Sequence, residues 1–202
     1  LSAYSPGGFS LVKDKDVPSA QMVSAIAMMS GVGNHSSVDL EKMLAGKMVT
    51  ARPFVSEFEE GFNGSSSPKD AEEMLQLIHL YFTNPRFDES AFNAYMSRIQ
   101  AVLQNAGNNP NMIFNDSISF MMSDRHFRRR PMNVNLLAEV DFNTLQKIYR
   151  DRFANAGDFT FVFVGNINPA EFKPLVETYL GSHSNTKRKE SWKDNNIRFP
   201  KG

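Results

Sequence analysis

The sequence has no cysteine and only four histidines among its 202 residues. Without cysteine it cannot form a disulfide, an iron–sulfur cluster or a thiolate zinc site, or use a cysteine nucleophile. It also has no net charge, because 22 Lys and Arg balance 22 Asp and Glu. Non-specific nucleic-acid binders rely on a general positive field, so we expect no nucleic-acid partner. No apolar run reaches the ~20 residues of a membrane span.

The rest of the composition is that of a folded globular chain. Hydrophobic residues make up 41% and charged residues 22%, which suffices for a sizeable core in one large domain or two small ones. The charge is unevenly placed, since residues 1–100 carry 8 basic and 12 acidic side chains and residues 101–202 carry 14 and 10. We therefore expect the two halves to attract each other.

Helices are predicted where a capping residue precedes apolar residues at helical spacing. Asp16, Ser36, Ser67, Asp88 and Asn168 are such start signals, and proline follows two of them. The predicted helices run from Asp16 to Gly31, Ser36 to Gly46 (Leu40, Met43 and Leu44 inward), Ser67 to Phe82, Asp88 to Asn105, Pro110 to Met121, Asp141 to Tyr149 and Asn168 to Gly181.

Strands are predicted from alternation and from apolar runs. We expect a hairpin of residues 1–4 and 9–12 around Pro-Gly-Gly, two strands within 48–64, and a central strand over 159–165, which is apolar on both faces. The segment 123–135 is predicted to be a loop. The fold class is α+β, a mostly antiparallel sheet with helices packed on one face. We expect residues 1–181 to form the domain, and the charged residues 182–202 to form a linker to a following domain.

The ends of the chain suggest a piece of a longer protein. Leu1 to Tyr4 is typical of a strand entered partway, and the chain stops after Phe199-Pro200-Lys201-Gly202 without a closing element.

The residues alone do not assemble a catalytic site. His35, His79, His126 and His183 are scattered, and a hydrolytic metal site needs three converging ligands. His79 lies among apolar residues, so a packed or half-exposed helix position is favoured over a ligand.

Three further patterns have ordinary structural interpretations. Ser30-Gly31-Val32-Gly33 ends a helix, whereas a nucleophile elbow or phosphate loop follows a strand. The arginines at 128–130 could contact phosphate, but a loop edge or a partner for the acidic half is favoured. Glu57, Glu59 and Glu60 are expected to point outward from a strand.

Several segments in order resemble the M16 family of zinc metallopeptidases, the pitrilysin, insulinase and processing-peptidase group. The resemblance covers nearly the whole chain and is closest to the bacterial branch with two fused halves. The segments that carry it are Ala3 to Gly8, Ser66 to Asp70 with Leu80-Tyr81-Phe82, Pro85 to Asp88, Ile148 to Phe153, Gly165-Asn166-Ile167 and Tyr179-Leu180-Gly181. The resemblance implies the LuxS/MPP-like metallohydrolase fold.

The same resemblance implies that the zinc ligands are missing. The family's active half carries H-x-x-E-H on its first helix and a further glutamate on a later helix. Met22, Ala25 and Ile26 stand where the histidines and the glutamate would be, and no glutamate occurs from Ser90 to Ala138. The region expected for the later ligand holds Leu103, Gln104 and Asn105.

The resemblance therefore implies a non-catalytic, substrate-enclosing domain of an M16-like zinc endopeptidase acting on peptides. Its partners would be a catalytic half of the same chain, which would hold the zinc, and the peptide substrate. Strands 48–64 would correspond to the edge that holds peptide in the active half. A periplasmic or envelope location fits the family. The alternative is a scaffold module of an M16-like complex without protease activity.

Overall fold

The computed structural model describes residues 1–105 and 109–201. Its sheet has the order β2-β3-β1-β4, and every neighbouring pair is antiparallel. The strands are β1 (Ser2–Pro6), β2 (Val49–Val55), β3 (Glu59–Ser66) and β4 (Thr160–Val162). The α+β class and the antiparallel sheet predicted from the sequence are confirmed.

The predicted helices all form. Their bounds are α1 (Val17–Ser30), α2 (Ser37–Met43), α3 (Ala71–Thr83), α4 (Glu89–Asn105), α5 (Pro110–Met122), α7 (Phe142–Arg152) and α8 (Pro169–Tyr179), with a short α6 (Val134–Leu137). The start signals act as expected at Ser36, Asp141 and Asn168, whose side chains accept hydrogen bonds from backbone N–H groups of the first turn. None of the helices in residues 1–105 and 109–201 is long and apolar enough to cross a membrane.

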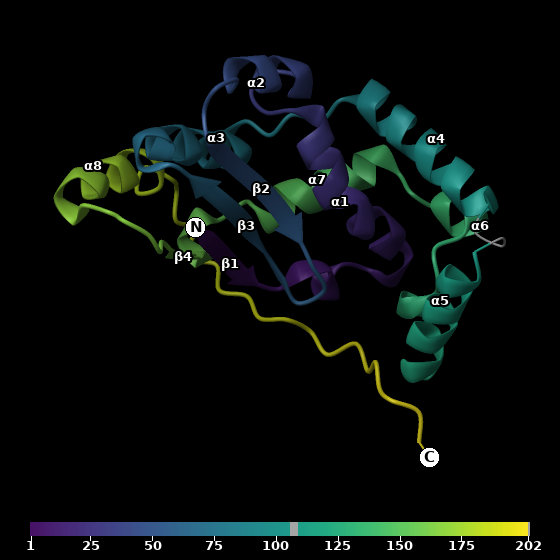
Figure 1. The fold of residues 1–202 in the computed structure, drawn as a ribbon. Coiled ribbons are helices and arrows are strands. Elements are labelled where there is room, and N and C mark those ends of the chain that lie inside the picture. The colour runs from purple at the N-terminus through teal and green to yellow at the C-terminus, as the bar shows by residue number, and fades with distance from the viewer. Residues whose placement is uncertain (106–108, 202) are drawn as a thin grey trace.

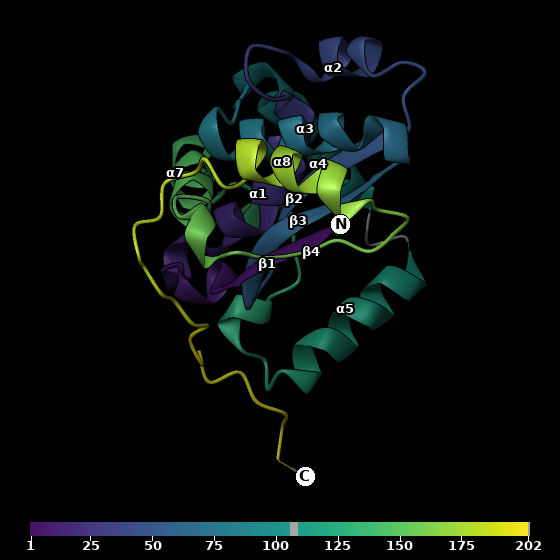
Figure 2. The ribbon, with the colours of Figure 1, turned by 90° about the vertical axis from the view of Figure 1, so that its left-hand side faces the viewer.

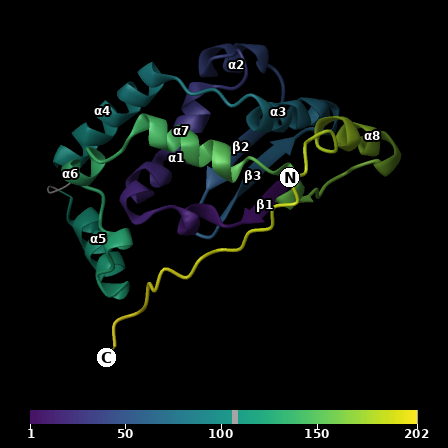
Figure 3. The same cartoon turned by 180° about the vertical axis from the view of Figure 1, so that it is seen from behind.

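The helices cover one face of the sheet. In Figure 1, α1 and α7 lie behind the strands, and Figure 3, seen from the other side, shows them in front of the strands. Helix α3 also packs on β2 and β3, and the opposite face of the sheet is free of helices. Helix α8 lies beside α3 at the end of the sheet where the N-terminus is placed, and α5 projects from the far end (Figure 2). The structure is therefore a two-layer arrangement with one open sheet face.

The core lies between the sheet and this helical layer. Phe62 of β3 is 0% exposed and contacts aromatic rings from α3, α7 and the β4 region. The centroids of Phe82 and Phe153 each lie 5.0 Å from that of Phe62, and the Phe159 centroid lies at 6.3 Å. This cluster joins residues more than 90 positions apart and fixes the two chain halves together.

The predicted N-terminal hairpin is wrong. Residues Gly8–Leu11 form a 3-10 helix instead of a strand, and β1 pairs with β3 and β4. The Gly8 N–H donates to the buried Glu60 carboxylate at 2.6 Å, and the Phe9 N–H donates to the Ser56 carbonyl at 2.9 Å. These long-range bonds take the backbone groups that a hairpin would have paired locally.

The predicted central strand 159–165 is also wrong in its position. Only residues 160–162 are paired, and β4 lies at an edge of the described sheet. Its apolar residues are divided between faces: Phe159 is buried, whereas Val162 is 42% and Val164 86% exposed. The apolar run at 159–165 therefore does not form a strand that is buried on both faces.

Two local expectations also fail. Met43, predicted to point inward, is 56% exposed because α2 is short and lies at the periphery (Figure 1). The predicted loop 123–135 contains a 3-10 turn over Phe127–Arg129 and the start of α6, which the Asn133 side chain caps.

Residues 182–201 form no helix or strand but follow the surface of the domain. The Trp192 ring packs edge-on against Phe58 with centroids 5.3 Å apart. The Lys193 N–H donates to the Ser10 hydroxyl at 2.9 Å, and the Asn195 amide donates to the Ser10 carbonyl at 3.0 Å. We call residues 183–195 the C-terminal strap.

Candidate functional site

The positions that the family resemblance assigns to zinc ligands lie on α1. Ile26 is fully buried in the core, and Met22 and Ala25 are partly buried. None of the three side chains carries a nitrogen or oxygen donor, so they do not fit a zinc ion. Within residues 1–105 and 109–201, no three His, Asp or Glu side chains come close enough to hold a metal.

The serine hydroxyls of α1 accept hydrogen bonds from the backbone of other segments. The Ser24 hydroxyl accepts a hydrogen bond from the Val55 N–H at 2.9 Å, which ties the helix to the end of β2. The Ser19 hydroxyl accepts from the Asp141 N–H at 2.9 Å, and the Ser30 hydroxyl accepts from the Asp88 N–H at 3.0 Å. The polar side chains of α1 thus anchor three other segments.

The most unusual polar feature is a buried cluster of ions at the start of β3. The side chains of Glu60 and Arg152 are 1% and 4% exposed, and their closest oxygen and nitrogen lie 4.0 Å apart. Arg152 also pairs with Asp151 at 2.5 Å and with Glu190 of the strap at 3.0 Å. The cluster therefore joins β3, the end of α7 and the strap.

Burial controls the protonation of Glu60. Loss of hydration raises its pKa to about 7, although the Gly8 N–H and the Arg152 guanidinium both favour the charged form. The contact with Arg152 favours the charged form of Glu60, whereas burial favours the neutral form. Burial prevails, since Arg152 is 4.0 Å away and is shared with two closer carboxylates.

The prediction that Glu57, Glu59 and Glu60 point outward together is therefore wrong for Glu60. Glu60 and Phe62 are two residues apart on a strand and so share the buried face. Strict alternation through β3 would have placed Glu60 inside. An isolated buried carboxylate is so costly that the sequence alone favours an outward position.

The arginines at 128–130 fulfil the structural expectation. The Arg128 side chain is 4% exposed and pairs with Asp14 at 2.6 Å, while Arg129 pairs with Glu57. Arg128 also donates to the carbonyls of Phe9 and Val12. The basic C-terminal half thus binds the acidic N-terminal half, and Arg128 is engaged within the fold.

The histidines do not converge on one site, but two of them meet. The His79 and His183 rings stack with centroids 4.7 Å apart, and His79 Nδ1 lies 2.9 Å from the Tyr179 carbonyl oxygen. Burial, with His79 adding to it, lowers the pKa of His183. His79 is a packed helix residue, as predicted, and its contact with His183 has no counterpart in sequence spacing.

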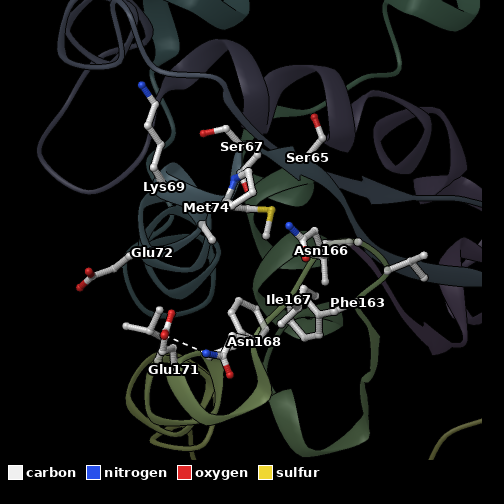
Figure 4. A pocket seen from close by; sticks show the side chains of 18 residues that line it. Ser65, Ser67, Lys69, Glu72, Met74, Phe163, Asn166, Ile167, Asn168 and Glu171 are labelled. Carbon is white, nitrogen blue, oxygen red and sulfur yellow. Dashed lines mark hydrogen bonds between the residues drawn. The ribbon is translucent and has the colours of Figure 1, made fainter.

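A pocket of about 700 Å³ opens at the end of the sheet, between the start of α3 and the start of α8 (Figure 4). One wall comes from the end of β3 and the turn into α3, including Ser65, Ser66 and Met74. The other comes from the segment after β4 and from α8. The family resemblance rests partly on lining residues, at 66–70 and 165–167, but the sequence did not predict a pocket, because 64 to 174 positions separate Leu1 from the other lining residues.

Comparison with known proteins finds distant relatives that are named as zinc proteases. No family model matches the chain. A protein from Arabidopsis thaliana named zinc protease PQQL-like is 25% identical over 182 residues, which are 90% of this chain and 16% of that protein. The probable zinc protease PqqL of Escherichia coli is 27% identical over 171 residues, covering 81% of this chain and 18% of that protein.

Solved structures share the fold over almost the whole chain. The periplasmic protease PqqL from Escherichia coli matches with a TM-score of 0.78 at 20% identity, over 98% of this chain and 22% of that one. A peptidase M16 inactive domain from Pseudomonas fluorescens matches with a TM-score of 0.68 at 13% identity, over 94% of this chain and 47% of that one. The matched part of this chain thus spans only 16% and 18% of the length of these two curated relatives. The chain is related in sequence to proteins named as zinc proteases, and it shares the fold of solved structures that include a peptidase M16 inactive domain.

Proposed function

We propose that this chain is the non-catalytic, substrate-enclosing unit of an M16-like zinc endopeptidase that acts on peptides. One observation carries the proposal. In a domain with the M16 fold, the helix to which the resemblance assigns the zinc motif presents Met22, Ala25 and Ile26. Zinc and the hydrolytic step then belong to a catalytic half of the same polypeptide, and no step of the reaction uses residues described here.

The helix-free face of the sheet is the surface we assign to the enclosed chamber. Tyr4 is in register with Thr160, and Val162 lies two residues further along the same neighbouring strand. Tyr4 and Val162 are each 42% exposed, and Val164, which continues this face, is 86% exposed. The part of this face formed by β1 and β4 is partly apolar, which suits contact with varied peptide sequences.

Photo-crosslinking in a longer protein that carries both halves tests the enclosing role. A benzophenone amino acid at position 162 should crosslink a bound peptide, and the same residue replacing Lys173 should not. Lys173 is the matched control because its side chain is 76% exposed on α8, which packs beside α3 (Figure 2). Equal labelling at both positions, or labelling at 173 alone, would contradict the assignment.

A scaffold module without protease activity is the second candidate. Helix α5 favours it, because Phe114 is 63%, Met121 54% and Ile118 45% exposed along a helix that projects from the domain (Figure 1). An apolar helix face of this kind suits a lasting contact with another domain. The two candidates differ in the longer protein, which hydrolyses peptides if the first is correct and is inert if the second is correct.

A further inference from the structure

Two carboxylates share one guanidinium nitrogen in the buried ion cluster. Arg152 Nη1 lies 3.0 Å from Glu190 Oε2 of the strap and 4.0 Å from Glu60 Oε1 of β3. A Cβ atom at Gly7 would lie 2.9 Å from the same nitrogen, so the turn after β1 closes another side of the guanidinium. The position of the strap therefore decides how much of Arg152 is available to Glu60.

The charges of the cluster do not balance while every group is ionised. Asp151 and Arg152 come from the end of α7, and Arg188 and Glu190 come from the strap. Together with Glu60 they make three carboxylates and two guanidiniums. One bound proton makes the cluster neutral. Glu60 is the most buried of the three acids, since its side chain is 1% exposed, against 21% for Glu190 and 58% for Asp151.

The other neighbours of Glu60 carry no charge. In the sheet it is in register with Ser5 of β1 and Val55 of β2, and the Gly8 N–H donates to its Oε2 at 2.6 Å. The adjacent Glu59 is exposed and points to the opposite face of the strand. A neutral carboxyl group still accepts the Gly8 bond through Oε2, so the neutral form of Glu60 fits the site.

The strap makes ionisation of Glu60 less favourable. It belongs to the yellow segment below the strands in Figure 1, and its Glu190 has the closer contact with Arg152. Loss of hydration is the largest cause of the raised pKa of Glu60, and the charge of Glu190 raises this pKa further, while Arg188 opposes it more weakly. Because such coupling is reciprocal, ionisation of Glu60 weakens the docking of the strap by the same factor.

We propose that the strap is held on the domain while Glu60 is neutral and is loosened when Glu60 ionises. With the strap docked, the pKa of Glu60 is about 7, and without the strap it is lower. The contribution of Glu60 to docking is thus fully present below the lower value and is lost as pH rises to about 7. This inference does not depend on the proposed function.

The other contacts of the strap do not give this pH dependence. Asn155 binds backbone groups of the strap and Trp192 packs against Phe58, and neither contact titrates. His183, stacked on His79, does titrate, but burial lowers its pKa and its protonation opposes docking in acid. Its effect has the opposite sign, so a loss of docking with rising pH identifies Glu60.

Amide hydrogen exchange at pH 5 and pH 8 tests the inference on the 202-residue chain. The reporters are the Thr186 N–H, which donates to Asn155 at 3.0 Å, and the Lys193 N–H, which donates to the Ser10 hydroxyl at 2.9 Å. The amide of Leu145, a fully buried residue of α7, reports the opening of the whole domain. Protection factors are compared, because they correct for the intrinsic effect of pH on exchange.

We expect the protection of both strap amides to fall at least about tenfold from pH 5 to pH 8, while staying below that of Leu145. Glu60→Gln, which cannot ionise, should abolish the fall, and Glu59→Gln should retain it. Constant protection in the parent, or an equal fall in Glu60→Gln, would overturn the proposal. Strap amides as protected as Leu145 would also overturn it, because the strap would then open only with the whole domain.

A second variant leaves the buried Glu60 in place. Glu190→Gln removes the carboxylate that competes with Glu60 for Arg152. The strap amides of this variant should be less protected at pH 5 than those of the parent, and their protection should fall less between pH 5 and pH 8. A fall as large as in the parent would show that the two carboxylates do not compete, and the proposal would be wrong.

Discussion

The carboxylate of Glu60 lies 4.0 Å from the guanidinium of Arg152, and both side chains are buried where β3, α7 and the strap meet. Because burial raises the pKa of Glu60 from 4.5 to about 7, the folded state holds a proton that the unfolded state has released between these pH values. The contribution of Glu60 to stability is thus fully present below pH 4.5 and is lost as pH rises through 7. The change amounts to about 3 kcal/mol for a shift of this size.

Glu60→Gln should remove this pH dependence. The amide oxygen of the introduced glutamine can still accept from the Gly8 N–H, and Arg152 keeps its contacts with Asp151 and Glu190. Urea unfolding at pH 5 and pH 8 measures the effect as the difference between the variant and the parent. Glu59→Gln, at an exposed neighbour on the same strand, is the control. Parallel stability curves for Glu60→Gln and the parent would show that Glu60 does not titrate in this range.

His183 should give the opposite dependence. Its pKa is lowered by burial and by the stacked His79, so the unfolded state binds a proton more readily. Stability from this group is present above the ordinary histidine pKa of 6.5 and falls as pH drops through the lowered value. His183→Phe keeps a ring beside Phe82 and should flatten the acid limb of a plot of Tm against pH. An acid limb as steep as in the parent would contradict the assignment.

Asn155 should control the attachment of the strap. Its buried side chain accepts from the Thr186 N–H at 3.0 Å and donates to the Arg188 carbonyl at 3.0 Å. Asn155→Ala removes both bonds, which is expected to weaken the attachment by about 1–3 kcal/mol. Limited proteolysis within residues 183–195 should become faster by a corresponding factor.

The control for this experiment is Asn143→Ala, at an exposed position in the first turn of α7. It should leave the cleavage rate within the strap unchanged. If the Asn155→Ala protein is cleaved no faster than the Asn143→Ala protein, the strap is held by its other contacts, chiefly those of Arg152 and Trp192.

Phe62 should be the most sensitive core position. It is 0% exposed and lies at the centre of the aromatic cluster, so Phe62→Ala should cost about 3–5 kcal/mol in the free energy of unfolding. Phe114→Ala removes the same group from a side chain that is 63% exposed and should cost less than about 1 kcal/mol. Chemical denaturation of both variants checks the contrast, and similar costs would contradict the assigned core.

The parts of the fold that were predictable depend on local chemistry. Helix starts at Ser36, Asp141 and Asn168 could be predicted because a side chain caps the turn that follows it. The predicted pairing of the two oppositely charged halves also formed, through Arg128 with Asp14 and Arg129 with Glu57.

The predictions that were wrong concern segments whose bonding partners lie far away in the sequence. The residues after Pro6 could have formed a hairpin, but the Gly8 N–H bonds Glu60, which is 52 positions away. The stacked His79 and His183, and the two walls of the pocket, likewise come together only through the tertiary fold. The apolar composition of segment 159–165 is typical of a central strand. In the sheet, however, β4 pairs only with β1 and therefore lies at an edge.

The most direct test of the non-catalytic assignment is the zinc content of the purified 202-residue chain after dialysis against zinc, combined with hydrolysis of a quenched peptide by the same sample. We predict zinc far below one equivalent and no hydrolysis above a buffer control, because Met22, Ala25 and Ile26 supply no ligand. One equivalent of zinc together with hydrolysis that a chelator abolishes would contradict the account.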